Sequence, residues 1–231
     1  MDNIFYTHPN NISEGRLELT DQEARHAAKV LRFGPGDELY ASDGEGNIFK
    51  TKVISASKNS VQTEIEETDH QSEPEIRKVL GFGAIKKRDR FEFAVEKAVE
   101  LGAWEICIFT GDHSERSKIN QDRLRSIALS AFKQSKRRWL PEIIFLNALE
   151  EVMSHYDGYH LIMAHVENRV NTPDSLTNKE NLLLVGPEGG FSDREIQLCA
   201  SKDADFISLG KNRLRAETAV AAILSQYLFS K

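Results

Sequence analysis

The sequence predicts an α/β protein of two domains, a small β-barrel in residues 1–72 followed by a parallel-sheet domain in residues 73–231. Residues 1–72 contain short alternating apolar and polar runs punctuated by glycine-rich turns, which is typical of small barrels. The rest of the chain alternates strand-like and helical patterns, which favours parallel strands covered by helices on both faces. The polar stretch 67–73, ending at Pro74, is the expected linker.

The first domain is predicted to hold one short helix, Asp21–Leu31, and several strands. The strand-like runs are Glu38–Ala41, Ile48–Ser55 and Ser60–Glu66. Turns are expected at 34–36 and 43–46, because glycine and proline interrupt regular structure and let the chain reverse.

The second domain shows strand-like runs with helical patterns between them. The runs are Lys78–Ile85, Glu105–Thr110, Glu142–Leu146, Tyr159–His165, Asn181–Val185 and Phe206–Leu209. Helices are predicted at Arg88–Leu101 and Gln121–Arg138, and another is expected to be capped by Asn147, which has Glu150 three residues later. Ser192 and Glu195 form a capping box for a further helix. The last helix carries the apolar residues Ala219, Val220, Ile223, Leu224 and Leu228.

Composition limits the class of protein only broadly. Of 231 residues 40% are hydrophobic, which is enough to bury a core. No apolar run is long enough to span a membrane and residues 1–10 do not resemble a signal peptide, so a cytoplasmic location is expected. Cys107 and Cys199 lie in apolar patterns, which predicts buried thiols rather than a disulfide. No spacing of histidine, cysteine and carboxylates predicts a metal site.

The net charge of −6 conceals a local reversal of sign. Residues 1–73 hold 7 Lys and Arg against 14 Asp and Glu, and subtraction from totals of 30 and 36 leaves 23 against 22 in the remainder. Between Arg116 and Arg138 there are eight basic residues and one acidic residue, Asp122, mostly within the predicted helix. Such a stripe is typical of a phosphate-binding surface, and an ordinary solvated helix face gives the same pattern.

Two loops carry the clearest functional pattern. Three glycines fall within Gly186–Gly190, after one apolar run, and Leu209–Ala219 follows the next. Glycines let a backbone approach a ligand closely, and the carboxyl ends of parallel strands are where α/β sheets usually bind small molecules. The dinucleotide and nucleoside-triphosphate glycine patterns are absent. The loops therefore predict a site for a compact ligand, with a tight strand-to-helix turn as the alternative interpretation of Gly186–Gly190.

These segments resemble a known family. GPEGGFSDREI (186–196) and LGKNRLRAETA (209–219) are similar to the two signature segments of the small-subunit ribosomal RNA uracil-N3 methyltransferases, a branch of the SPOUT superfamily. Further matches occur at 26–37, at 96–102 and at Gln134–Arg137. The chain departs from the family pattern at 211–213, where Lys-Asn-Arg replaces Pro-Arg-Ile, and at Lys133, where the family commonly has an acidic residue.

The resemblance implies a SPOUT methyltransferase domain with a C-terminal trefoil knot, preceded by a PUA-like β-barrel, and a homodimer. It implies that the loops 163–167, 185–191 and 209–215 hold S-adenosylmethionine. The residues expected to bind this methyl donor are Met163, Ala164, His165, Val185, Gly186, Pro187, Glu188, Gly189, Gly190, Leu209, Gly210, Leu214, Arg215, Thr218 and Ala219. The last helix is expected to supply part of a two-fold interface or to pack on its own sheet. By the same analogy the substrate is uridine 1498 of 16S ribosomal RNA in the small ribosomal subunit, which would place the protein in ribosomal RNA processing and ribosome biogenesis.

The chemistry so implied needs a cation beside the uracil. N3 carries a proton and is a poor nucleophile, so the site must stabilise the charge that develops on the flanking carbonyl oxygens. Arg215 is the first choice for this role and Arg213 the second. Glu188 and Glu217 are candidate proton acceptors. The alternatives are that Glu188 balances the sulfonium or holds its loop, and that Glu217 stabilises the first turn of the last helix.

Three groups of side chains are predicted to contact RNA. The first is the helical set Arg25, Lys29 and Arg32, for which a solvated face is the alternative. The second group lies at a strand-to-helix turn and consists of Lys86, Lys87, Arg88 and Arg90. The third group ends the basic helix and consists of Gln134, Lys136, Arg137 and Arg138. Together they would extend one phosphate track that reads backbone and shape.

Two other classes of function stay open on the sequence. One is a non-catalytic RNA-binding or ribosome-assembly protein that has lost donor binding, which the departures at 211–213 favour. The other is a small-molecule enzyme that uses the same loops for a nucleotide, which the acidic net charge favours.

Overall fold

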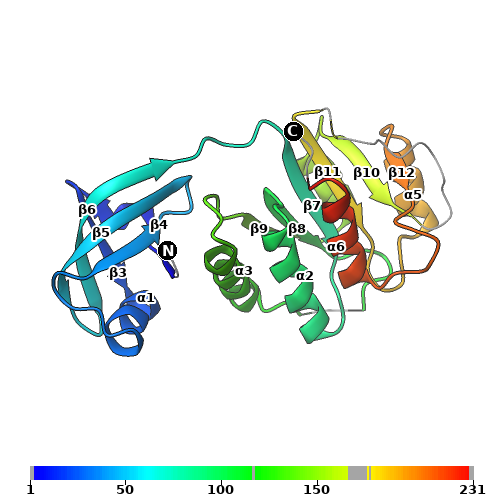
Figure 1. The fold of residues 1–231 in the computed structure, drawn as a ribbon. Coiled ribbons are helices and arrows are strands. Elements are labelled where there is room, and N and C mark those ends of the chain that lie inside the picture. Colours follow the sequence, from blue (N-terminus) through cyan, green and yellow to red (C-terminus); the bar gives the residue numbers. More distant parts are fainter. Residues whose placement is uncertain (1–2, 116–117, 166–175, 177, 229–231) are drawn as a thin grey trace. The chain divides into compact units, whose positions relative to one another are not determined.

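Two compact units make up the chain (Figure 1). The computed structural model describes residues 3–115, 118–165, 176 and 178–228. The first unit combines residues 1–73 with residues 129–140, and the second combines residues 74–128 with residues 141–231.

The first unit is built on a six-stranded sheet of order β1-β4-β5-β6-β3-β2. Its strands are β1 (Ile4–Tyr6), β2 (Ile12–Ser13), β3 (Arg16–Thr20), β4 (Glu38–Ser42), β5 (Asn47–Ala56) and β6 (Ser60–His70). β1 and β4 are parallel and the other pairs antiparallel. Phe5, Leu19 and Val61 belong to the core of this unit.

The predicted start of the linker, residue 67, is too early in the sequence. Residues 67–70 continue strand β6, because the start of β5 pairs with them from Asn47↔His70 to Lys50↔Glu67. Strands β1 to β3 were not predicted, and each is at most five residues long. The predicted strands 38–41, 48–55 and 60–66 are confirmed, each with slightly longer ends.

The short helix of the first unit changes its winding along its length. α1 (Asp21–Arg25) is α-helical and η2 (His26–Val30) is a π-helix, in which the Leu31 N–H bonds the His26 carbonyl at 3.0 Å. Arg25, Lys29 and Arg32 therefore do not share a regular α-helical face, although all three are exposed. A short 3-10 turn, η1 (Pro9–Asn11), precedes β2.

Residues 138–140 add a short extended segment to the turn between β4 and β5. The Gly46 N–H donates to the Arg138 carbonyl at 2.9 Å and the Leu140 N–H donates to the Gly44 carbonyl at 3.0 Å. Both glycines have positive φ, and a Cβ on either would come within 3 Å of the segment's Leu140 or Trp139 side chain. The turn therefore needs glycine at both positions, and the segment belongs to the first unit.

The second unit is built on a six-stranded sheet whose strands are all parallel, as predicted. The strand order is β12-β10-β11-β7-β8-β9. Its strands are β7 (Arg77–Gly83), β8 (Glu105–Phe109), β9 (Glu142–Leu146), β10 (His160–Ala164), β11 (Glu180–Val185) and β12 (Asp205–Ile207). Strands β7 and β11 lie inside the sheet and are almost wholly buried, which explains why they appear as continuous apolar runs in the sequence.

Helices cover both faces of this sheet. They are α2 (Arg88–Glu100), α3 (Gln121–Ser135), α4 (Leu149–His155), α5 (Asp193–Ala200) and α6 (Ala216–Gln226). α4 and α5 share a core with Val79, Cys107 and Leu182. α2 and α6 lie side by side (Figure 1) and cover the opposite face, where the Phe91 ring of α2 meets Phe82 of β7 edge to face.

Two predicted helix ends are wrong and one is confirmed. α3 stops at Ser135 because Lys136 takes a left-handed conformation with φ of 56°. Asn147 does not cap α4: the N-cap is Ala148, and the Asn147 N–H instead donates to the Glu151 carboxylate at 2.9 Å. The capping box of Ser192 and Glu195 is present at the start of α5.

The described part of the chain has no helix long and apolar enough to cross a membrane. Within the same residues, no group of three or more histidine, cysteine and carboxylate side chains could hold a metal ion. Cys107 and Cys199 are free and buried, as predicted, and burial raises the pKa of each thiol to about 12.

Candidate active site

A cavity of about 710 Å³ opens at the carboxyl ends of β10, β11 and β12. The loops that follow these strands form it, together with the start of α6 and the side chain of Arg90 from α2. The carboxyl ends of parallel strands meet at one edge of the sheet, which brings together loops that are distant in sequence. Both glycine-containing segments singled out in the sequence therefore line one cavity.

Most residues expected to bind a donor line this cavity. Met163 and Thr218 are the exceptions among the fifteen candidates. The Met163 side chain is buried in the core with α4 and α5, and Thr218 is exposed on α6. Val166 and Glu167, which complete the first expected loop, lie outside the described residues. Lining residues beyond the predicted ranges include Arg90, Asp193, Ile196 and Ser208.

The glycine-rich loop after β11 is a tight turn packed against its surroundings. The Gly190 N–H donates to the Pro187 carbonyl at 2.9 Å, and Gly190 has φ of 74°. A Cβ on Gly189 would come within 2.7 Å of the His113 Cβ, and one on Gly186 would come within 3.0 Å of the Gly190 carbonyl carbon. Both sequence interpretations thus describe the same loop, since the tight turn is also a wall of the cavity.

The Glu188 side chain ties this loop to the end of β7. Its carboxylate accepts the backbone N–H of Lys86, with nitrogen-to-oxygen distances of 2.9 and 3.2 Å. The Glu188 carbonyl accepts from Arg213 Nη2 at 3.3 Å, which links the loop after β11 to the loop after β12. Of the roles considered for Glu188, holding its loop is the one with visible contacts.

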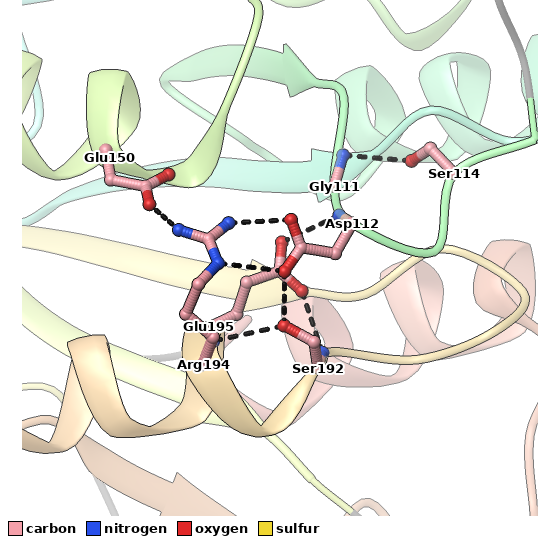
Figure 2. A network of polar contacts seen from close by, with 7 residues as sticks. All are labelled: Gly111, Asp112, Ser114, Glu150, Ser192, Arg194 and Glu195. Carbon is pink, nitrogen blue, oxygen red and sulfur yellow. Dashed lines mark hydrogen bonds and ion pairs between the residues drawn. The ribbon is translucent and has the colours of Figure 1, made fainter.

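A polar network fixes the far end of the loop, where α5 begins (Figure 2). The buried Glu195 carboxylate accepts the backbone N–H groups of Ser192 at 2.8 Å and Asp112 at 3.1 Å. The Asp112 carboxylate in turn accepts from the Ser192 hydroxyl at 2.5 Å and from Arg194 at 2.6 and 3.1 Å. Arg194, between the carboxylates of Asp112 and Glu150 in Figure 2, holds the pKa of Asp112 below its usual range.

This network was only partly visible in the sequence. The capping box follows from spacing within one helix, whereas Asp112 lies in the loop after β8, 80 residues from Ser192. No local pattern marks that pairing. With Glu188 at one end and the network at the other, the glycine-rich loop is anchored on both sides.

Among the described residues three arginines line the cavity, and they differ in their contacts. Arg213 donates to the Glu188 carbonyl, and Arg90 Nε lies 3.4 Å from Glu217 Oε1. Arg215 is the N-cap residue of α6 and is exposed, and its side chain has no hydrogen-bond or ion-pair partner among the described residues. Of the two arginines predicted from the sequence, Arg213 contacts Glu188, and the Arg215 guanidinium has no partner within the described ranges.

Glu217 is buried in the first turn of α6 and does not line the cavity. Its Oε1 pairs with Arg90, and its Oε2 is buried without a hydrogen-bond partner in the described structure. Arg90 was expected in the RNA-facing cluster with Lys86, Lys87 and Arg88. The structure instead places it in the cavity wall, a position that depends on contact between α2 and α6.

The predicted RNA-contacting side chains differ in their contacts. Lys86, Lys87 and Arg88 are all exposed, and Lys86 pairs with Glu115 and Arg88 with Glu92. In the first unit Gln134 and Lys136 are exposed. Arg138 donates to the carbonyl and carboxylate of Asp69 at 2.8 and 2.5 Å.

Burial and pairing also reduce the basic stripe expected along α3. Burial lowers the pKa of Arg137 to about 10, and Lys133 pairs with Glu23. Arg123 binds Glu92 and Arg125 stacks on the Phe145 ring. Several of these basic side chains thus serve the fold, while Arg116 lies outside the described residues.

Comparison with known proteins places this chain in one class of protein. The RNA methyltransferase domain family matches residues 71–228, and the RNA methyltransferase PUA domain family matches residues 19–66. The chain belongs to the RNA methyltransferase domain family. Within it, the chain is a member of the family of ribosomal RNA small subunit methyltransferase E, as its signature segments predict.

Individual relatives agree along most of the chain. Ribosomal RNA small subunit methyltransferase E of Mesomycoplasma hyopneumoniae is 35% identical over 73% of this chain and 77% of its own length. A probable rRNA methyltransferase of Porphyromonas gingivalis has a similar structure, with a TM-score of 0.84, 30% identity and coverage of 96% and 95% of the two chains. The structure of Neisseria gonorrhoeae ribosomal RNA small subunit methyltransferase E, solved bound to S-adenosylmethionine, is also similar. Its TM-score is 0.83 and its identity 27%, and the match covers 97% of this chain and 96% of the Neisseria chain.

Proposed function

We propose that this protein transfers a methyl group from S-adenosylmethionine to N3 of one uridine in 16S ribosomal RNA, the nucleotide at position 1498. The observation that carries the proposal is the cavity: both family signature segments, 186–196 and 209–219, contribute to its walls. Family membership supports the class of reaction and of substrate. The exact nucleotide rests on the family resemblance alone.

The cavity fits a donor of this kind. Its volume of about 710 Å³ lies in the range of small-molecule and cofactor sites. Gly186 and Gly189 stand where a Cβ would strike neighbouring atoms, so the loop backbone itself forms the wall. The Neisseria relative was solved with the same donor. We assign donor binding to the lining residues of the loops after β10, β11 and β12.

The protein's part in the chemistry is to position the base and stabilise its charge. When bound, the donor supplies a methyl on a positively charged sulfur; transfer breaks the C–S bond and forms the C–N bond, leaving a neutral thioether. N3 must lose its proton, and the resulting charge spreads onto the two carbonyl oxygens of the uracil. Arg215, whose guanidinium has no partner among the described residues, is assigned to those oxygens.

Neither candidate carboxylate is assigned to proton transfer. The Glu188 carboxylate is occupied by the Lys86 N–H, and Glu217 stands behind Arg90 outside the cavity lining. Both are assigned to holding the site, and the N3 proton passes to solvent. The contact of Arg213 with the Glu188 carbonyl supports the choice of Arg215 over Arg213, because Arg213 already links two loops.

Finer features of the architecture belong to the same proposal. We propose a domain division near residue 72, a C-terminal trefoil knot and a cytoplasmic homodimer. The strand order β12-β10-β11 supports the knot, since the chain passes from β11 back beyond β10 to reach β12. Val220, Ile223 and Leu224 are buried within the unit, so the dimer interface must use exposed side chains such as Phe93 and Leu228.

The test is methyl transfer from labelled S-adenosylmethionine to small ribosomal subunits that lack this modification, with mapping of the labelled nucleotide by mass spectrometry. Label at N3 of a single uridine is the expected result. Donor binding without label would direct the search to another RNA. Absence of donor binding would sink the proposal and favour the non-catalytic assembly protein, while turnover without RNA would favour a small-molecule enzyme.

A further inference from the structure

The ion pair of Arg90 and Glu217 joins two helices at the wall of the cavity. Arg90 is in the first turn of α2 and Glu217 in the first turn of α6, and their Nε and Oε1 atoms are 3.4 Å apart. Only Arg90 lines the cavity. Glu217 therefore stands on the protein side of the guanidinium, with the cavity on the other.

The Glu217 carboxylate that pairs with Arg90 is buried, which is unusual for a charged side chain. Glu217 is 8% exposed, and its Oε2 has no hydrogen-bond partner within the described structure. A buried carboxylate costs free energy unless it is paired, and its removal leaves the partner's charge uncompensated. The contact restrains the Arg90 guanidinium, because its Nε pairs with Glu217. The N–H donors of its two Nη groups are not used by this pair.

Those remaining donors have no partner in the part of the chain that the structure describes. Glu217 is the only hydrogen-bond or ion-pair partner of the Arg90 side chain among the described residues. The side chain is 23% exposed, so it sits at the wall rather than in open solvent. A guanidinium presents its donors in a planar fork that matches two oxygens of a phosphate or a carboxylate. The wall thus carries a cation suited to an anionic oxygen ligand.

The position of Arg90 in the chain favours a phosphate. Arg90 follows 86–88, a basic turn that leads from the end of β7 into α2, and Lys87 there is exposed and has no side-chain partner among the described residues. N3 is on the pairing edge of uracil, so the target nucleotide must leave its stack to be methylated. Its base would enter the cavity while its phosphates stay with the RNA backbone at the rim.

We propose that Arg90 binds a backbone phosphate of the nucleotide being methylated, and that buried Glu217 is the positioning residue that holds Arg90 for this contact. The inference rests on the proposed function and adds a phosphate ligand to the same site. It assigns Glu217 a role in RNA binding that requires no proton transfer.

The test compares Arg90→Ala, Arg90→Lys and Glu217→Gln with the wild type in two binding measurements, neither of which requires turnover. Calorimetry gives the affinity for S-adenosylmethionine, and filter binding of small-subunit RNA at several salt concentrations gives RNA affinity and its salt dependence. For Arg90→Ala we expect RNA affinity to fall about 10- to 100-fold and the salt slope to flatten by about 0.7–0.9, the change for one lost phosphate contact. Donor affinity should stay within about twofold.

Glu217→Gln keeps the shape of the side chain and removes its charge. We expect a smaller loss of RNA affinity, about five- to tenfold, and little further loss when it is combined with Arg90→Ala, because both changes remove one contact. Compared with Arg90→Ala, Arg90→Lys should recover more of the salt slope than of the RNA affinity. Lysine keeps the positive charge but lacks the planar pair of N–H donors of a guanidinium.

The matched control is Arg77→Ala with Glu180→Gln, an arginine–glutamate pair with an N–O distance of 3.9 Å at the amino ends of β7 and β11. Thermal unfolding of every variant separates loss of folding from loss of binding. Weakened donor binding with unchanged RNA binding would overturn the proposal and assign Arg90 to the donor's carboxylate. Unchanged RNA affinity in a folded, methylating Arg90→Ala enzyme would overturn it too, whereas a wild type without methyl transfer would instead refute the proposed function.

Discussion

Pro187 lies so close to Gly83 that a Cβ on Gly83 would come within 2.5 Å of the Pro187 Cδ. Gly83 is the last residue of β7, and Pro187 is in the glycine-rich loop after β11. The end of β7 thus packs directly against the loop that follows the neighbouring strand β11. No side chain fits between them, so the position of the cavity wall depends on a missing Cβ.

Replacing Gly83 by alanine should therefore disturb both stability and donor binding. Overpacking typically costs about 1–3 kcal/mol, and the loop must shift to relieve it. We expect a lower melting temperature and weaker S-adenosylmethionine binding, measured by thermal unfolding and calorimetry. Gly34→Ala is the control, because nothing lies within 4 Å of a Cβ at Gly34. Equal donor affinity in wild type and Gly83→Ala would show that the loop does not need this contact.

Arg215 and Arg213 should fail in different ways when each is replaced by alanine. Loss of one charge-stabilising donor typically lowers kcat by about 100-fold or more, and we expect this for Arg215→Ala with donor affinity preserved. Arg213→Ala breaks the link to the Glu188 carbonyl, so donor affinity should fall more than kcat. Steady-state kinetics on small subunits together with donor calorimetry would separate them. Exchange of the two phenotypes would reverse the assignment.

Glu92 should make stability depend on acid pH. Hydrogen bonds from Arg123, and secondarily from Arg88, hold the pKa of its carboxyl at about 2, against an ordinary 4.5. A folded pKa below the unfolded one stabilises the folded state above the unfolded value, and this contribution disappears as pH falls toward the folded value. The free energy of unfolding should therefore exceed that of Glu92→Gln by a constant amount above about pH 5.5, about one unit above the unfolded pKa.

Denaturant unfolding of the two proteins at a series of pH values measures this difference. It should shrink between about pH 4.5 and pH 2, as the Glu92 carboxyl is protonated in the unfolded chain and then in the folded one. A difference that did not vary with pH would mean that the two arginines contribute no net charge stabilisation.

Lys136 and Arg138 allow the RNA contribution of residues 129–140 to be separated from its structural one. Arg138 binds Asp69 of β6, so Arg138→Ala should mainly lower the melting temperature. Lys136 is exposed, and Lys136→Ala should mainly weaken RNA binding and flatten the salt slope by about 0.7–0.9. RNA binding at several salt concentrations and thermal unfolding are the measurements. A Lys136→Ala protein with the wild-type slope would remove this residue from the RNA surface.

The elements predicted well from the sequence are those whose pattern is set locally. Buried parallel strands such as β11 consist of apolar residues, and the capping box of Ser192 and Glu195 follows from spacing within one turn. The π-helical turn 26–30 and the end of α3 were missed. The π-helical turn was missed because its sequence has the same periodicity as an α-helix. The end of α3 was missed because it depends on Lys136 in a left-handed conformation, which glycine usually adopts.

The candidate site was predictable as far as its backbone. Glycines in the two signature segments mark where the chain must approach a ligand or itself, and the structure places both segments on one cavity. Side-chain roles were harder to predict because partners come from distant elements. Asp112 meets Ser192 across 80 residues, and Arg90 enters the wall only because α2 packs beside α6. Tertiary packing, which leaves no mark on local spacing, decides both.

The short segment at residues 138–140 makes the two units interleaved along the gene. A fragment that ends at residue 73 would encode the strands of the first unit but not the residues that bond Gly44 and Gly46. A fragment that begins at residue 74 would carry that missing piece as an unpaired insertion. Exchange of the first unit between relatives therefore needs two crossovers, and residues 129–140 must travel with the strands that they complete.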